Sequence, residues 1–339
     1  MKDNLKLQPL VSVITVNYNH SADTIAMIYS LKNCSYKNIE IIVIDNDSQN
    51  DDPYIISKTF PDIKLIVLPN NLGFAGGNNE GFRYSTGEYL LLLNNDTELD
   101  PGFLEPLVET LQSNSEIGMV SPRLLFYHSP EMKTIQYAGA CKINLLTGRG
   151  RNIGWSEVDN GQYNYVCETD YAHGAALMLN REVLTKVGCM PDVFFLYYEE
   201  HDWCTAMQKK GLKAYYVGTS KVFHKESVSI GKNSPVKTYY MTRNRIIFLR
   251  RNANWINFTI AILFFLLISV PVGVFRYLKN KESHLLKYYF SAILWNFTHF
   301  KNLNGFPKLV TSENKLAELS GTYHHLATHS NFVKSINKK

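Results

Sequence analysis

Short apolar runs and amphipathic segments alternate along the first 120 residues of the chain. Near-continuous apolar runs, rich in β-branched residues, are typical of strands buried on both faces, and they occupy 10–16, 39–45, 63–69 and 88–94. Helical spacing lies between them, over 21–31, near 53–60 and over 100–114. A loop is predicted over 70–79, and it leads into a further helix that ends near Gly87. Because strands and helices alternate, the pattern predicts an α/β fold whose mostly parallel sheet has helices on both faces.

The pattern is less regular between residues 117 and 240. A strand is predicted over 171–180, a short helix directly after it, a helix over 199–211 and strand-like runs over 212–218 and 220–226. The glycine-rich stretch 145–154 predicts a mobile loop. Pro235 opens a long predicted helix that includes the basic run 243–251.

The C-terminal part combines apolar and basic segments. Residues 252–275 contain no charge over 24 positions, which is long enough to cross a bilayer. A second uncharged stretch, 288–300, has 13 residues and is too short to cross as a straight helix. We therefore expect membrane-associating helices over 241–300, followed by a polar, basic tail over 301–339.

Charge divides the chain in the same place. Of the net charge of +5, residues 1–240 contribute −6 and residues 241–339 contribute +11. An acidic body suits a divalent metal, and a basic part mixed with apolar residues favours an anionic membrane surface over nucleic acid, so no nucleic-acid partner is expected. Five scattered cysteines without a C-x-x-C pair argue against a zinc finger or a disulfide framework, and the N-terminus lacks an apolar signal core.

Polar residues follow each of the first four predicted strands, in the segments 15–19, 45–48, 70–79 and 94–97. Asn, Asp and Gly also favour ordinary turns. However, parallel strands end at one edge of the sheet, where α/β folds bind their ligands, so four such ends together predict a site. No G-x-G-x-x-G follows the first strand and no G-x-x-x-x-G-K-[ST] occurs, which argues against a dinucleotide oxidoreductase and a P-loop NTPase.

Several carboxyl groups and one histidine are candidates for chemistry. Asp96 follows a buried strand and could bind a hard divalent cation together with phosphate. Glu199, Glu200 and Asp202 crowd the start of one helix, beyond what complementing the helix dipole needs. His224 follows a strand, and as an isolated histidine it is either structural or a metal ligand.

In this order and spacing the chain resembles the family 2 inverting glycosyltransferases, in particular their bacterial rhamnosyltransferase-like branch. The resemblance covers about 240 residues and rests on VSVITVNYN (11–19), VIDNDSQND (43–51), NLGFAGGNNEGF (71–82), YLLLLNNDTELDPGFL (89–104), GAALMLNREVLTKVG (174–188), FFLYYEEHDWC (194–204), FHKESVS (223–229) and YYMTRNRIIFLRR (239–251).

The resemblance implies a glycosyltransferase A fold, a nucleotide-sugar donor, and Mg²⁺ or Mn²⁺ as cofactor. It assigns Asp96 and His224 to the metal, because Asn94-Asn95-Asp96 stands where the family has D-x-D. It makes Glu200 the expected catalytic base, with Glu199 and Asp202 shaping the site, although the sequence leaves open which of these acids is the base. The residues expected to bind the nucleotide or donor are Thr15, Asn17, Tyr18, Asp45, Asn46, Gly76, Gly77, Asn79, Asn94 and Asn95.

These features predict a catalytic domain over 1–240, with a nucleotide-sugar half to about residue 120 and an acceptor half after it. The expected reaction moves a sugar from dTDP-rhamnose or a UDP-hexose to a lipid-linked or polysaccharide acceptor. We expect the enzyme at the cytoplasmic face of the cell membrane, bound peripherally, by a re-entrant helix pair or by a single span.

Two alternatives stay open. The first is a sugar nucleotidyltransferase or another nucleotide-binding enzyme on a related fold. Such enzymes commonly carry a Gly-rich basic first loop, whereas this chain has VNYNH there. A non-catalytic membrane-bound scaffold would have lost its acids, but Asp96, Glu200 and Asp202 are present.

Overall fold

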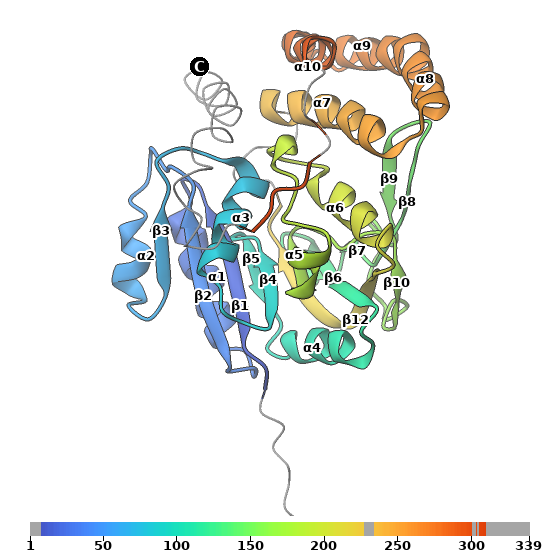
Figure 1. The fold of residues 1–339 in the computed structure, drawn as a ribbon. Helices are drawn as coiled ribbons and strands as arrows, with labels where there is room; N and C mark the ends of the chain where they lie inside the picture. The colour runs from blue at the N-terminus through green and yellow to red at the C-terminus, as the bar shows by residue number, and fades with distance from the viewer. Residues whose placement is uncertain (1–7, 227–233, 300–302, 304, 310–339) are drawn as a thin grey trace, which may run out of the picture.

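A computed structural model of the chain describes residues 8–226, 234–299, 303 and 305–309. The N-terminal half alternates strands and helices as predicted (Figure 1). The elements are β1 (Val11–Asn17), α1 (Ser21–Lys32), β2 (Ile39–Asp45), α2 (Tyr54–Thr59), β3 (Lys64–Val67), α3 (Gly73–Tyr84) and β4 (Tyr89–Leu93). The apolar runs form parallel strands because helices cover both of their faces, and β1, β2 and β4 are almost completely buried.

The second half extends the same sheet with mixed strand directions. Its elements are β5 (Thr97–Leu99), α4 (Leu104–Ser113), β6 (Ile117–Phe126), β7 (Ile135–Tyr137), β8 (Ala140–Asn144), β9 (Arg149–Asn152), β10 (Val166–Thr169), β11 (Ala176–Asn180), α5 (Glu182–Lys186), α6 (Glu199–Gln208) and β12 (Lys213–His224), with single 3₁₀ turns at Pro130–Met132 and Asp192–Phe194. The strand order is β10-β12-β6-β11-β4-β1-β2-β3. β11 runs antiparallel to β4 and β6, while β12 runs parallel to β6.

Several predicted elements differ from the structure, among them the loop predicted over 70–79, within which α3 already begins at Gly73. The stretch 145–154, predicted as a loop, forms the tip and second strand of the β8–β9 hairpin, whose turn needs the left-handed Gly148 (φ +61°). The helix predicted over 100–114 begins only at Leu104, because residues 100–103 form a turn in which the Phe103 N–H donates to the Asp100 carbonyl at 3.1 Å. The strand predicted over 171–180 begins at Ala176, and residues 171–175 before it are irregular.

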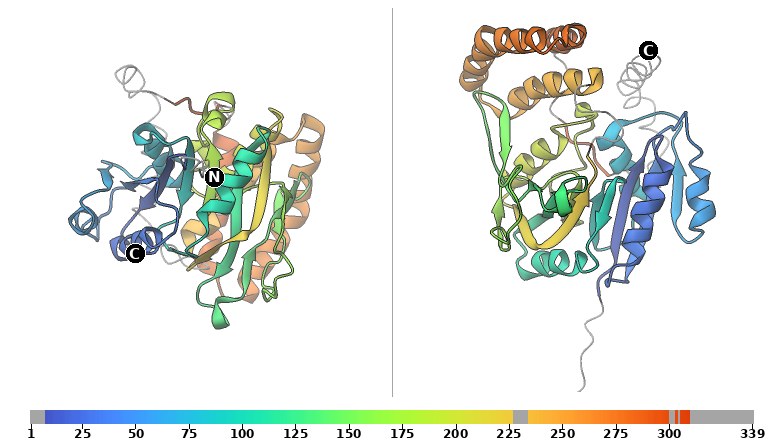
Figure 2. Two further views of the ribbon diagram at one scale, coloured as in Figure 1. Left: turned by 90° about the horizontal axis from the view of Figure 1, so that it is seen from below. Right: turned by 180° about the vertical axis from the view of Figure 1, so that it is seen from behind.

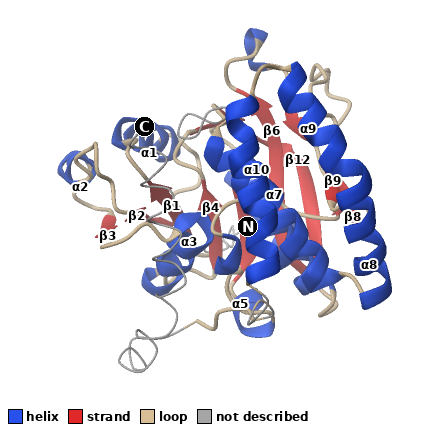
Figure 3. Cartoon of the chain, turned by 90° about the horizontal axis from the view of Figure 1, so that it is seen from above, coloured by secondary structure: helices blue, strands red, loops and turns tan. Residues whose placement is uncertain are grey.

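A helical layer lies beyond one end of the sheet. It consists of α7 (Pro235–Asn252), α8 (Trp255–Phe264), a π-helical turn (Phe265–Ser269), α9 (Val270–Lys279), a 3₁₀ turn (Ser283–Leu285) and α10 (Leu286–Thr298). The layer stands over the half of the sheet that contains β6 and β12, away from β2 and β3 (Figures 1 and 2). From above, α8 and α9 run end to end beside α7 and α10 (Figure 3).

Helix α7 belongs to both parts of the chain. The boundary predicted between residues 240 and 241 falls inside it, and most of its side chains from Val236 to Leu249 are buried. The predicted polar tail, 301–339, lies almost entirely outside the described residues.

An ion pair fastens α7 to α6. The Arg251 guanidinium lies 2.8 Å from the Asp202 carboxylate, and the Asn252 amide donates to the other Asp202 oxygen at 2.6 Å. The side chains of Arg251 and Asp202 are only 4% and 2% exposed. The candidate catalytic acid Asp202 is therefore engaged in packing two helices.

We expect Asp202→Asn to lower the free energy of unfolding by about 3–5 kcal/mol, because it leaves the buried Arg251 charge without its carboxylate. Urea denaturation measures the change. The matched control is Asp62→Asn, which removes the exposed pair between Asp62 and Lys32 (2.6 Å) and should change stability little. Equal stability of Asp202→Asn and the wild type would contradict this account.

Candidate active site

The carboxyl ends of β1, β2 and β4 open onto one cavity of about 410 Å³. Because these strands are parallel and adjacent, the polar residues that follow them meet at this edge of the sheet. The predicted site residues that line the cavity are Tyr18, Asn46, Asn94, Asn95, Asp96, Glu199, Glu200 and His224. Residues before and after position 120 both contribute to it.

Thr15, Asn17 and Asp45 lie behind the cavity wall and are fully buried. The Asn17 amide donates to Asp45 Oδ1 at 2.8 Å, and the Ser48 hydroxyl donates to the same oxygen at 2.6 Å. The Ser48 backbone N–H donates to Asp45 Oδ2 at 3.1 Å. These bonds fix the turn after β2, so Asn17 and Asp45 hold the wall of the cavity from behind.

Asn46 holds the loop that precedes α3. Its amide donates to Asn71 Oδ1 and to the Gly73 carbonyl, both at 3.0 Å, and its oxygen accepts from Leu72 N at 2.8 Å. The cavity therefore has a wall built by side-chain hydrogen bonds to backbone, a common device in Asn-rich turns.

Gly76, Gly77 and Asn79 do not line the cavity, although the sequence placed them near the donor. A Cβ on Gly77 would lie 3.0 Å from Val16 Cγ2, so this glycine lets α3 pack closely on β1. A Cβ on Gly76 would meet the Leu72 side chain at 2.7 Å. Asn79 bonds both backbone groups of Met190, accepting at 3.0 Å and donating at 2.8 Å, and thereby ties α3 to the acceptor half.

Asp96, in the turn between β4 and β5, meets His224, the last residue of β12, in the cavity. Asp96 Oδ1 lies 3.1 Å from His224 Nε2, and both side chains are almost fully buried. His224 Nδ1 lies 2.9 Å from the amide oxygen of Gln136, a contact that fixes the orientation of the ring with Nε2 toward Asp96. Burial opposes ionisation of Asp96, but the neighbouring His224 and Lys225 hold its pKa below the usual value.

The segment 193–198 precedes α6 and positions the carboxyl groups of Glu199 and Glu200. Three of its residues, Phe195, Tyr197 and Tyr198, have left-handed backbones with φ of 65°, 70° and 77°. For large side chains this conformation costs on the order of 1–3 kcal/mol each and is found where surrounding structure enforces it, often at functional sites. Glu199 and Glu200 follow immediately as the first residues of α6.

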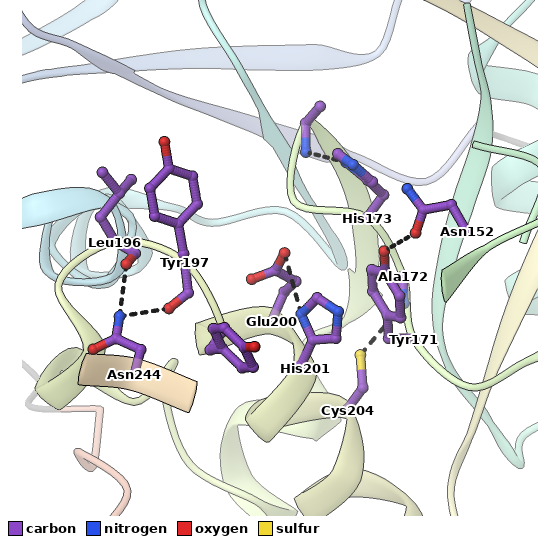
Figure 4. Close-up of polar contacts among 12 residues, drawn as sticks. Asn152, Tyr171, Ala172, His173, Leu196, Tyr197, Glu200, His201, Cys204 and Asn244 are labelled. Atoms are coloured by element: carbon purple, nitrogen blue, oxygen red, sulfur yellow. Dashed lines mark hydrogen bonds and ion pairs between the residues drawn. The ribbon is translucent and has the colours of Figure 1, made fainter. Parts of the chain in front are cut away.

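The pKa values of Glu199 and Glu200 shift in opposite directions. Burial raises the pKa of Glu199 well above its usual value, and the neighbouring Glu200 charge adds to the effect. Burial also opposes ionisation of Glu200, but the adjacent His201, 3.5 Å away, lowers the Glu200 pKa below its usual value (Figure 4). Glu200 is thus the ionised member of the pair, and its Oε2 has no hydrogen-bond partner among the described residues.

Several cavity residues were not predicted from the sequence. His173 lines the wall beside Glu200, and burial lowers its pKa to about 3, so its ring is neutral. Gln136, which orients His224, comes from β7, and Trp155 and Phe74 add aromatic surface. His173 and Gly174 lie inside the strand predicted over 171–180, so the pattern does not mark them as site residues. Gln136 is 88 positions from His224, and no sequence pattern connects the two.

Comparisons with known proteins agree with this geometry. Residues 12–186, just over half of the chain, match the family model described as glycosyl transferase family 2. The chain is 24% identical over 298 residues to the dTDP-rhamnosyl transferase RfbF of Shigella flexneri, covering 84% of this chain and 94% of that protein. It is 26% identical over 242 residues to the low-salt glycan biosynthesis hexosyltransferase Agl10 of Haloferax volcanii, covering 70% of this chain and 74% of that protein.

Solved structures share the fold at low identity. The mannosyltransferase PcManGT from Pyrobaculum calidifontis, in complex with GDP-Man and Mn²⁺, superposes with a TM-score of 0.52 and 16% identity, over 86% of this chain and 88% of its own. GalNAc-T7 with UDP, GalNAc and Mn²⁺ superposes with a TM-score of 0.56 and 14% identity, over 73% of this chain and 48% of its own. The predicted glycosyltransferase A fold is therefore confirmed, and the sugar nucleotidyltransferase and scaffold alternatives lose their support. With a matching family model over residues 12–186, this chain belongs to glycosyl transferase family 2 and is a glycosyltransferase.

Proposed function

We propose that this chain transfers a sugar, with inversion, from a nucleotide-sugar donor to a glycan or lipid-linked acceptor in cell-surface glycan synthesis. The observation that supports it most directly is one cavity that holds an ionised carboxylate, Glu200, and a separate Asp96–His224 pair. The first suits a base and the second suits a metal-bound diphosphate. The Shigella relative favours dTDP-rhamnose as donor, and the Haloferax relative favours a hexose donor such as a UDP-hexose.

Asp96 and His224 are the residues that we propose for Mg²⁺ or Mn²⁺. His224 Nε2, which loses its proton when a cation binds, and the Asp96 oxygen 3.1 Å from it suit one cation, and Asn94 and Asn95 line the same cavity. No cluster of three or more His, Cys, Asp or Glu able to hold a metal occurs in the part of the chain that the structure describes. Donor phosphate oxygens would therefore complete the coordination. When bound, the cation neutralises the charge that collects on the departing nucleoside diphosphate.

Glu200 is the proposed base. The acceptor hydroxyl loses its proton to Glu200 Oε2 while its oxygen forms a bond to the anomeric carbon, and the bond from that carbon to the donor phosphate breaks. Attack from the side opposite the phosphate inverts the anomeric configuration. Neutral Glu199 cannot accept this proton, but its carboxyl can donate a hydrogen bond within the site.

We expect Glu200→Gln to lower kcat by roughly 10²–10⁴-fold while leaving donor binding intact, because the amide keeps the shape but cannot accept the proton. Glu199→Gln is the matched control and should lose far less, since the Glu199 carboxyl is already neutral. Steady-state transfer assays measure kcat, and calorimetry measures donor affinity. A Glu200→Gln enzyme with wild-type kcat would show that another group is the base.

Asp96→Asn should abolish Mn²⁺-dependent binding of the nucleoside diphosphate and should abolish transfer, because the amide removes the charged ligand from the site. Calorimetric titration of Mn²⁺ with dTDP or UDP measures the binding. The control is Asp23→Asn, which removes a carboxylate that pairs with Lys225 outside the cavity. Full transfer by Asp96→Asn in excess EDTA would refute the metal assignment.

We further propose that α8, α9 and α10 attach the enzyme to the cytoplasmic face of a membrane. Among the described residues one helical stretch, Trp255–Lys279, is long and apolar enough to cross a bilayer. Its most apolar 18 residues have a mean hydropathy of 2.6, and only 17% of them are buried. Large apolar side chains on this layer that are exposed include Trp255, Ile256, Ile260, Leu263, Leu267, Ile268, Val272, Phe275, Leu278, Phe290, Leu294 and Phe297. A soluble protein seldom exposes so much contiguous apolar surface.

Basic residues flank the apolar stretch on both sides, with the half-buried Arg250 before it and the exposed Arg276 and Lys279 after it, whereas Arg251 is buried against Asp202. Positive charge at both ends gives no inside–outside asymmetry, which favours helices that lie in or re-enter one leaflet over a single crossing. Anionic lipid attracts each exposed cation by about 1 kcal/mol. A lipid-linked acceptor would then be presented at the surface on which the enzyme sits.

Replacing Leu267 and Phe275 together by Asp should reduce binding to vesicles of phosphatidylcholine and phosphatidylserine by about 100-fold or more, because each apolar side chain contributes about 1.5 kcal/mol or more when it enters the bilayer. The two side chains are 69% and 67% exposed, so the fold should survive. Co-flotation measures binding. The control replaces Tyr54 and Ile55 on α2 by Asp. Equal losses in both variants, or none in either, would contradict attachment through α8–α9.

A further inference from the structure

The side chain of Asn244, in the middle of α7, binds the segment that leads into the catalytic helix. Its amide nitrogen lies within hydrogen-bond distance of three backbone carbonyls, those of Phe194 (2.9 Å), Leu196 (2.7 Å) and Tyr197 (2.7 Å). Two of these bonds are drawn in Figure 4, with Glu200 close to the same segment. Asn244 is completely buried, so water cannot replace it as a donor.

Arg243 extends the same contact along the segment. Its Nη2 donates to the carbonyls of Val193 (2.6 Å) and Phe194 (2.7 Å). The guanidinium is also completely buried and lies 4.8 Å from the ring centres of Tyr240 and Trp295, the latter on α10. Two consecutive residues of α7 therefore bind four successive or near-successive carbonyls of one turn.

The turn needs these donors because of its shape. Its left-handed residues Phe195, Tyr197 and Tyr198 point successive carbonyls into α7 instead of into a helix or sheet, where backbone donors would meet them. From the opposite side the Phe74 N–H donates to the Phe195 carbonyl at 2.7 Å. A Cβ on Gly73 would come within 2.3 Å of that carbonyl oxygen, so the turn is held tightly between α3 and α7.

We propose that Asn244, with Arg243, is a positioning residue for the general base. It enforces the left-handed turn, and the turn sets where α6 begins and in which direction the Glu200 carboxylate points. Tyr198, the last left-handed residue, is the N-cap of α6, and Glu200 is only two positions beyond it. The inference rests on the proposed role of Glu200 as base and names a residue 44 positions away that this role requires.

The first test is Asn244→Ala, assayed for kcat, for donor affinity and for the melting temperature. We expect kcat to fall about 10²-fold, since a displacement of about 1 Å at a reacting group costs that much. Calorimetric affinity for dTDP or UDP with Mn²⁺ should be unchanged, because Asp96 and His224 do not contact the turn. Asn244→Ser, which keeps one hydroxyl donor, provides a milder variant if the alanine variant does not fold and should retain more activity than it.

The decisive test combines Asn244→Ala with Glu200→Gln. If Asn244 acts by aiming Glu200, then it has nothing to aim once Glu200 is gone, and the double variant should be no slower than Glu200→Gln alone. A purely structural role would lower kcat again in the double variant. The matched control is Asn296→Ala, a buried amide that bonds the Arg243 carbonyl (3.2 Å) on the α10 side and not the turn, and it should keep wild-type kcat.

The outcomes separate the two proposals. A Glu200→Gln enzyme that turns over normally overturns the base assignment and this inference with it. A Glu200→Gln enzyme that is inactive, together with a folded Asn244→Ala enzyme of wild-type kcat or with additive losses in the double variant, overturns this inference alone. Equal losses of kcat in Asn296→Ala and Asn244→Ala would also overturn it, because destabilisation of α7 would then explain both.

Discussion

The site depends on one geometric constraint, which is that β1, β2 and β4 are parallel, adjacent and in register. Their side chains are used up in packing against helices on both faces, so nothing along the strands is available for chemistry. Polar groups can meet a ligand only where the strands end, and the register brings those ends to one level. Elements from the second half of the chain close that edge. β12 places His224 next to Asp96, and α6 places Glu199 and Glu200 in the same cavity.

Much of this arrangement could be predicted because it is local in sequence. Buried strands followed by Asn or Asp are visible as patterns, and so is an acidic helix start after an apolar run. The prediction was less informative where one residue's role depends on distant backbone. Gly77 and Asn79 lie in the predicted donor loop, yet the contacts that decide their roles are with Val16 and Met190, and the latter is 111 positions from Asn79. Asp202 shares a helix turn with Glu200, but its position on the helix directs it to Arg251.

Two adjacent carboxyl groups buried in one cavity cannot both be charged at low cost, and the surroundings decide which one gives up its charge. Here the His201 charge outweighs burial at Glu200, whereas burial and the Glu200 charge outweigh the Arg243 charge at Glu199. The sequence EEHD contains all three groups but not their orientations, which explains why it left the choice of base open. The sequence likewise leaves open the identity of the donor sugar and of the acceptor. These depend on the shape of the cavity wall and not on the type of any single residue.

Helix α7 has a consequence for how such enzymes can be rearranged. The apolar layer after it looks like an exchangeable attachment, but α7 itself carries the donors that hold the turn before Glu199 and the arginine that pairs with Asp202. A recombination joint placed before α7 would separate the catalytic helix from its support, whereas a joint in the short link between Asn252 and Trp255 would keep α7 with the catalytic helix. A layer exchanged at that link would still have to supply the α10 face that packs on α7, because the Trp295 ring lies 4.8 Å from the Arg243 guanidinium and Asn296 bonds the Arg243 carbonyl.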